Sequence, residues 1–196
     1  MNFQRLVCFF AGLLLSQTSL GVDKNNIYAI KGAGLSSCKS FLQSVDNQDS
    51  AYLVYGGWIE GHITALNQQL ENTFDLTPWQ TTPFLLKLIA QNCRNKPEVQ
   101  FHQMVRAMLG EFLSQKIVEG KSFIKLNNDN SLIYQEDVIV QTKKALQVKG
   151  YFEGELDMEW NQDSVQALKK FQNDKSLPET GFPSQDTLFY LFYSTD

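Results

Sequence analysis

Apolar residues in the first half of the chain recur every three or four positions, which is the spacing of one face of an α-helix. The clearest stripe includes Tyr55, Trp58 and His62, and its segment also holds Gly56, Gly57 and Gly61. Each glycine inside a helix costs about 1 kcal/mol relative to alanine, so we expect close approach by another element there. Helices are expected over about residues 36–42, 48–70 and 82–93, and another begins near Pro97.

The second half shows three further helical stripes, and two of them have clear starts. We expect helices over about residues 137–149, from Asn161 and from Ser184, because Asn and Ser side chains cap helix N-termini. Residues 119–135 between the halves have no periodicity and are rich in turn-forming residues. Their apolar residues Phe123, Ile124 and Leu126 indicate that this linker packs on a domain. The pattern therefore predicts an all-α fold: a helical bundle, a linker and a small three-helix domain.

The first 21 residues have the composition of a secretory signal peptide. A positive charge at Arg5 precedes an apolar run over residues 6–15, and Ser19-Leu20-Gly21 resembles a cleavage site. This run is about ten residues long, whereas a membrane-spanning helix needs about 20. We expect export, and no membrane insertion once the peptide is removed. The expected organisation is a signal peptide (1–21), a helical domain (22–118), a linker (119–135) and a terminal domain (136–196).

Export also determines how the cysteines are interpreted. Cys8 leaves with the signal peptide, so Cys38 and Cys93 remain as an even pair in an oxidising compartment. A disulfide between these two residues is expected.

The charge of the chain excludes two classes of partner. Its formal net charge is −4, and residues 136–196 hold eleven acidic residues against six lysines. Nucleic acids and anionic membranes are bound through basic patches, so neither is expected as a partner.

Candidate catalytic chemistry is sparse. His62 and His102 are the only histidines, and no cluster of residues supplies the remaining ligands of a metal site. A cysteine paired with a histidine could form a thiol nucleophile, but a disulfide removes that option. Gly32-Ala33-Gly34 lacks the third glycine and the preceding strand of a phosphate-binding loop. We expect no catalytic residue, no metal and no cofactor.

Residues 137–192 resemble a known family. The segment from Gly150 to Asp157, followed by Trp160, is similar to a loop of the peptidoglycan-binding domain found beside many cell-wall hydrolases. Further motifs follow in the family's order: Ser164, Ala167-Leu168, Phe171-Gln172, Leu177-Pro178, Thr180-Gly181 and Thr187-Leu188. The resemblance implies a three-helix module that binds the glycan strand or the stem peptide of peptidoglycan.

Five residues of this module are candidates for contact with peptidoglycan. They are Tyr151, Phe152, Asp157, Trp160 and Gln172. Aromatic faces can meet sugar rings or peptides, while carboxylate and amide groups offer hydrogen bonds. The alternative is structural: the aromatic residues form the core of a small domain, and Asp157 accepts hydrogen bonds from backbone amides of its loop.

The chain departs from the family pattern at four positions. Met158 and Asn161 replace glycines, Lys143 replaces a glutamine, and Lys149 occupies an apolar position. Methionine resists a positive φ more than asparagine does, so we expect an altered loop.

The first domain resembles the small helical periplasmic proteins of the HdeA and Rap1a type. The similar residues are Gly34 to Cys38, Gly57 to Asn67, and Cys93 with Asn95 and Pro97. This resemblance implies a helical bundle closed by one disulfide, a periplasmic location, and a role as an acid-stress chaperone or immunity protein.

Together these observations favour a non-catalytic exported protein that binds peptidoglycan through its terminal domain and an envelope protein through its first domain. One alternative is a periplasmic immunity or chaperone-like protein whose terminal domain is a docking surface for proteins. Another is a cell-wall hydrolase without a recognised motif.

Overall fold

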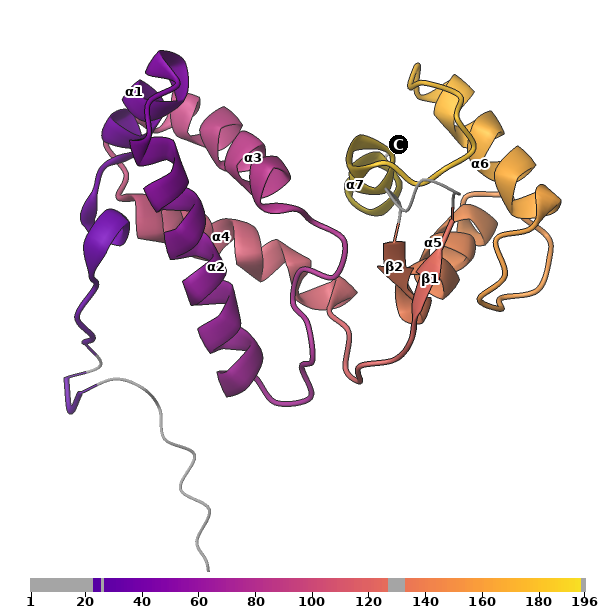
Figure 1. Cartoon of the computed structure of the whole chain (residues 1–196), viewed down its shortest axis with the longest axis horizontal. Helices are drawn as coiled ribbons and strands as arrows, with labels where there is room; N and C mark the ends of the chain where they lie inside the picture. The colour runs from indigo at the N-terminus through magenta and orange to yellow at the C-terminus, as the bar shows by residue number, and fades with distance from the viewer. Residues whose placement is uncertain (1–22, 26, 127–132, 195–196) are drawn as a thin grey trace, which may run out of the picture. The chain divides into compact units, whose positions relative to one another are not determined.

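The computed structural model describes residues 23–25, 27–126 and 133–194, so the expected signal peptide lies outside the described residues. Residues from Lys31 onward form one compact unit. Figure 1 shows the elements in chain order. They are η1 (Gly32–Leu35), α1 (Cys38–Asn47), α2 (Ala51–Gln69), α3 (Thr82–Asn95), α4 (Phe101–Phe112), η2 (Leu113–Gln115), β1 (Phe123–Lys125), β2 (Ile133–Gln135), α5 (Glu136–Val148), α6 (Gln162–Asp174) and α7 (Gln185–Tyr193).

Side-chain caps fix the starts of three helices. Ser37 accepts a hydrogen bond from the Ser40 amide at 3.2 Å, so α1 begins at Cys38 and continues past the expected end at Leu42 to Asn47. Asn161 caps α6 and Ser184 caps α7 in the same way, as the sequence predicts. Helix α4 begins at Phe101, four residues after Pro97, because residues 97–99 turn and Gln100 forms a β-bridge with Ser37 before it.

Helices α1 to α4 surround the larger hydrophobic core. Phe41, Tyr55 and Phe101 meet at its centre, with ring centroids 4.7–5.0 Å apart. The predicted disulfide joins Cys38 at the start of α1 to Cys93 near the end of α3, and both residues are fully buried. The cross-link therefore fixes α1 against α3 inside the core.

The three glycines of α2 serve different roles. A Cβ atom on Gly56 would lie 3.3 Å from Thr82 Cγ2, so this glycine allows α3 to approach closely, as expected. The same expectation is wrong for Gly57 and Gly61, because nothing lies within 4 Å of a Cβ atom built on either. Both are exposed on the outer face of α2.

The fold is mostly helical, but it also contains a short antiparallel strand pair that the all-α prediction omits. Strand β1 pairs with β2, and Ile124 lies opposite Tyr134. Ile124 and Leu126 pack against the larger core, in agreement with the expectation that this stretch packs on a domain, whereas Phe123 is exposed. The Tyr134 hydroxyl donates to the Pro183 carbonyl at 2.7 Å, so the strand pair is tied to the segment before α7.

Helix α7 contributes to both hydrophobic cores. Leu188 is buried in the larger core, whereas Leu191 is buried in a smaller core with α5 and α6. The rings of Phe189 and Phe192 lie 5.9 Å from those of Phe84 and Trp79 respectively.

Polar contacts extend the packing of α7. Gln185 accepts a hydrogen bond from the Thr81 amide at 2.9 Å and donates to the Trp79 carbonyl. Lys87 pairs with Asp186 at 2.8 Å, but both side chains are exposed, so this pair adds little stability. The first four helices and the last three are therefore joined by direct packing.

Loss of the disulfide should destabilise the whole fold. Cys38 and Cys93 are 55 residues apart, and closing such a loop stabilises by about 4 kcal/mol in the chain-entropy model. We predict that Cys38→Ala/Cys93→Ala lowers the free energy of unfolding by about this amount, measured by urea denaturation. A reducing agent should lower the stability of the wild type similarly and leave the double variant unchanged. Equal stability of the oxidised and reduced wild type would contradict the prediction.

The packing of α7 should stabilise both cores together. Leu188→Ala is expected to lower the free energy of unfolding by about 2–5 kcal/mol, because it leaves a cavity in the larger core. Tyr190→Ala on the exposed side of the same helix should change it by less than about 0.5 kcal/mol. Hydrogen exchange should show that Leu188→Ala weakens protection in α3 and in α6. Weakened protection in α3 alone would show that the two cores are independent.

Candidate functional site

Phe152 and Gln172, two of the five candidate contact residues, lie in the interior. Phe152 belongs to the smaller core formed by α5, α6 and α7. Gln172 is fully buried, and its amide nitrogen donates to Thr180 Oγ1, the Phe182 carbonyl and Thr187 Oγ1 at 3.0–3.2 Å. Its carbonyl oxygen accepts from the Gly181 amide at 2.8 Å. These side chains hold the domain together and offer no free surface to a ligand.

The turn at Gly181 is the backbone segment that the buried Gln172 holds in place. Its φ is +71°, and a Cβ atom there would lie 2.6 Å from Val165 Cγ1, so only glycine fits. The turn presses against α6, and Gln172 binds its backbone from the inside.

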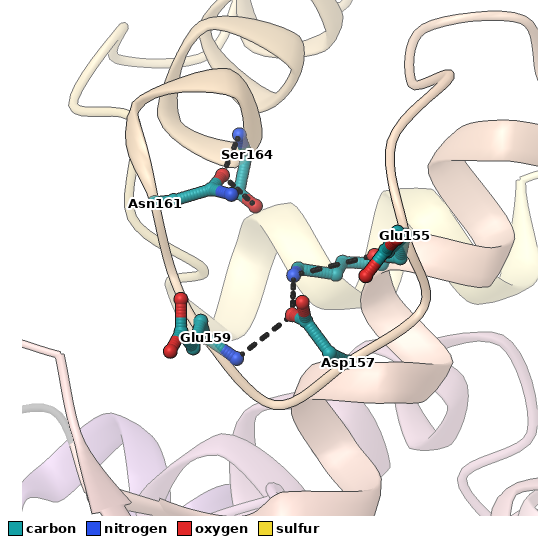
Figure 2. A network of polar contacts seen from close by, with 6 residues as sticks. Glu155, Asp157, Glu159, Asn161 and Ser164 are labelled. Carbon is teal, nitrogen blue, oxygen red and sulfur yellow. Dashed lines mark hydrogen bonds and ion pairs between the residues drawn. The ribbon is translucent and has the colours of Figure 1, made fainter.

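Asp157 organises the loop between α5 and α6 (Figure 2). Its Oδ1 atom accepts a hydrogen bond from Lys143 Nζ at 2.5 Å and another from the Glu159 amide at 3.0 Å. The second bond is the structural contact that the sequence suggests for this residue. Asp157 thus joins the buried side of the loop to its exposed tip.

The cation of this pair is buried. The Lys143 side chain is fully buried, whereas that of Asp157 is 42% exposed. Lys143 Nζ also lies 3.5 Å from the Glu155 carbonyl and 5.5 Å from the centre of the Phe152 ring. The hydrogen bond from Lys143, then the one from the Glu159 amide, lower the pKa of Asp157, although partial burial opposes the shift.

Met158 and Asn161, which replace glycines of the family pattern, do not adopt the left-handed backbone conformation. Among the described residues, the non-glycine residues with positive φ are Gln48, Asn72 and Ser176. Asn161 has a φ of −85° and caps α6, with its Oδ1 3.1 Å from the Ser164 amide (Figure 2). The backbone at Met158 and Asn161 is therefore unstrained, and the expected alteration of the loop relative to the family stays a prediction.

A shallow groove of about 370 Å³ lies beside this loop. Its lining residues come from β1 and the residue after it, and from the loop that precedes α6. They are Ile124, Lys125, Leu126, Met158, Glu159, Trp160 and Asn161. Trp160 is partly buried, and its Nε1 donates to the Gly181 carbonyl at 3.1 Å, so its ring is held in place at the groove.

Tyr151 lies apart from the lining of this groove. Its hydroxyl donates to Asp174 on α6 at 2.8 Å, and its ring packs edge-on against Phe171 at 5.4 Å. Of the four candidates on the loop between α5 and α6, Trp160 lines the groove and Asp157 lies two residues before Glu159 of its wall. Ile124, Lys125 and Leu126 were not candidates, because their strand lies outside the motifs that carry the family resemblance.

Comparison with known proteins identifies the terminal segment. Residues 135–189 match the peptidoglycan binding domain family, PG_binding_1. No curated protein and no solved structure gives a significant match to the chain. The family match supports peptidoglycan binding and a location at the cell wall, and no catalytic family is identified. The groove is therefore lined partly by this peptidoglycan-binding domain and partly by β1 outside it.

Outside the peptidoglycan-binding domain, both histidines belong to packed structure. His102 is buried with Nδ1 3.1 Å from the Gly34 carbonyl, and His62 stacks on Trp58 at 5.2 Å. Burial, then the nearby charges of Arg106 and His102, lower the pKa of His62. Residues 23–25, 27–126 and 133–194 contain no group of three His, Cys, Asp or Glu residues arranged to hold a metal ion. No helix in those ranges has the length and hydrophobicity to cross a membrane.

Removing the charge of Lys143 and removing that of Asp157 should destabilise the fold by different amounts. We predict that Asp157→Asn destabilises the fold more than Lys143→Met, because the first leaves a buried ammonium without its charged partner. Lys143→Met leaves a carboxylate that water can reach. The double variant Lys143→Met/Asp157→Asn should be more stable than Asp157→Asn alone. Urea midpoints at pH 7 test this order, and a reversed order would contradict it.

The Lys143–Asp157 pair should also make the free energy of unfolding depend on pH. The pKa of Asp157 in the folded protein lies below its ordinary value of 3.8, so the contribution of the pair is present in full above that pH. It is lost as the pH falls from 3.8 through the folded-state pKa. The difference in urea midpoint between the wild type and Asp157→Asn should therefore shrink below pH 3.8. A difference that stays constant down to pH 2 would contradict this assignment.

Proposed function

We propose that this protein is a non-catalytic, exported envelope protein that binds peptidoglycan through its C-terminal domain while its first domain contacts a protein partner. The match of residues 135–189 to the peptidoglycan binding domain family carries the proposal. The expected signal peptide supports export, since peptidoglycan lies outside the cytoplasm.

The groove supports a specific place for wall binding. It is open, and it combines a held aromatic ring with apolar and charged side chains at its rim. Such shallow surfaces bind an extended polymer weakly at each site, and many sites on one sacculus retain the protein by repeated contact. Trp160, Met158 and Asp157 are the family-loop residues that we assign to binding or to positioning the groove.

The outer face of α2 supports a protein partner for the first domain. Leu53 and Val54 are 73% and 62% exposed, and Gly57 and Gly61 follow on the same face at helical spacing. At Gly57 and Gly61 this strip has no side chain that would hold a neighbouring backbone away. The same strip favours the alternative function, an immunity or chaperone-like protein whose terminal domain is a docking surface.

Co-sedimentation with purified sacculi tests wall binding. A truncation before β2 would remove Tyr134 and Leu188 from the larger core, so point variants are the better comparison. We predict that the chain lacking residues 1–21 pellets with sacculi, and that Met158→Asp weakens binding about tenfold, equivalent to about 1.4 kcal/mol. Met158 lines the groove and is 47% exposed.

Leu156→Asp is the matched control. Leu156 is 39% exposed on the same loop but does not line the groove, so this change should leave pelleting unaltered. Equal losses in both variants would place binding elsewhere on the domain. A wild type that stays in the supernatant would reject wall binding and leave the protein-docking alternative.

A further inference from the structure

The groove beside the peptidoglycan-binding loop has two walls of different origin. Met158, Glu159, Trp160 and Asn161 lie inside the family match, whereas Ile124, Lys125 and Leu126 precede it. The pairing of β1 with β2 brings this outer wall to the loop, since β2 leads directly into α5. The groove of this chain therefore extends beyond the family domain.

The two walls carry opposite charges at the same groove. Lys125 on β1 and Glu159 on the loop are both exposed and both line it, while Trp160 and Met158 supply apolar surface. A glycan strand offers mainly uncharged hydroxyl and acetamido groups. A stem peptide that is not cross-linked offers free carboxylates, a free amino group on its dibasic residue, and alkyl side chains.

We propose that this groove recognises the stem peptide of peptidoglycan, with Lys125 binding a peptide carboxylate and Glu159 binding its free amino group. This inference rests on the proposed function and assigns its ligand. It makes Lys125, a residue outside the matched domain, a determinant of specificity. Charge complementarity of this kind fixes orientation and selects one ligand over another more than it adds affinity.

The Lys143–Asp157 pair positions Glu159 for this role. Asp157 holds the Glu159 backbone amide at 3.0 Å, and Lys143 holds Asp157 from the buried side. Trp160, the residue after Glu159, is fixed by its own hydrogen bond to the Gly181 carbonyl. The loop wall is thus held from both sides before a ligand arrives, so binding does not require it to be ordered.

The test is a calorimetric or NMR titration of the chain lacking residues 1–21 with two soluble probes. One is an uncross-linked disaccharide-peptide from peptidoglycan, and the other is the same disaccharide without its peptide. We expect the first to bind and the second to bind at least tenfold more weakly. Lys125→Gln and Glu159→Gln should each weaken binding of the disaccharide-peptide about 3- to 10-fold, and added salt should reduce these differences.

Lys170→Gln and Glu153→Gln are the matched controls. Both residues are exposed on the same domain and neither lines the groove, so each change alters net charge by the same amount as its test variant. Equal binding of both probes, or equal losses in test and control variants, would overturn the stem-peptide assignment while leaving wall binding intact. Failure of both probes together with failure to pellet with sacculi would instead overturn the proposed function.

Discussion

Packing of α7 against two separate cores is the constraint on which this fold depends. The smaller core contains six buried apolar residues in the part of the chain that the structure describes, which makes a domain of this size marginally stable by itself. Helix α7 closes that core with Leu191 and presents Leu188, Phe189 and Phe192 to the larger one. The peptidoglycan-binding domain therefore takes part of its stability from the disulfide-linked helices that precede it.

Buried polar side chains compensate for the small size of the second core. Gln172 binds the backbone around Gly181, and Lys143 binds Asp157 beneath the loop. Each side chain fixes an irregular segment from the inside, which apolar packing alone would leave free to move. A charged residue in this network needs its partner, because an unpaired ammonium in the interior is strongly unfavourable. The polar network thus acts as a scaffold that presents Trp160 and Glu159 at the surface.

Local signals in the sequence predicted the helices well. The caps at Ser37, Asn161 and Ser184 lie within three residues of the amides they bind, so their effect is visible in short stretches of sequence. The strand pair was missed because each strand has three residues, which is too short for an alternating pattern to stand out. The buried position of Lys143 was missed because lysines on helices usually face water.

The lining of the groove was predicted only in part for a similar reason. Family motifs pointed to the loop that carries Asp157 and Trp160, but the residues of the opposite wall precede those motifs. Gln172 and Phe152 belong to the same motifs and yet lie in the interior, since a motif records structural and surface residues alike. Long-range contacts such as those of Trp79 with α7 leave no local pattern in the sequence.

The place of α7 in the chain sets the order in which the two cores can form during synthesis. Most of the core residues that Leu188 and Leu191 join are synthesised earlier. Both cores therefore stay open until residue 191 has left the ribosome. A chain that still lacks α7 cannot reach its final packing, so neither core is completed before this helix is available.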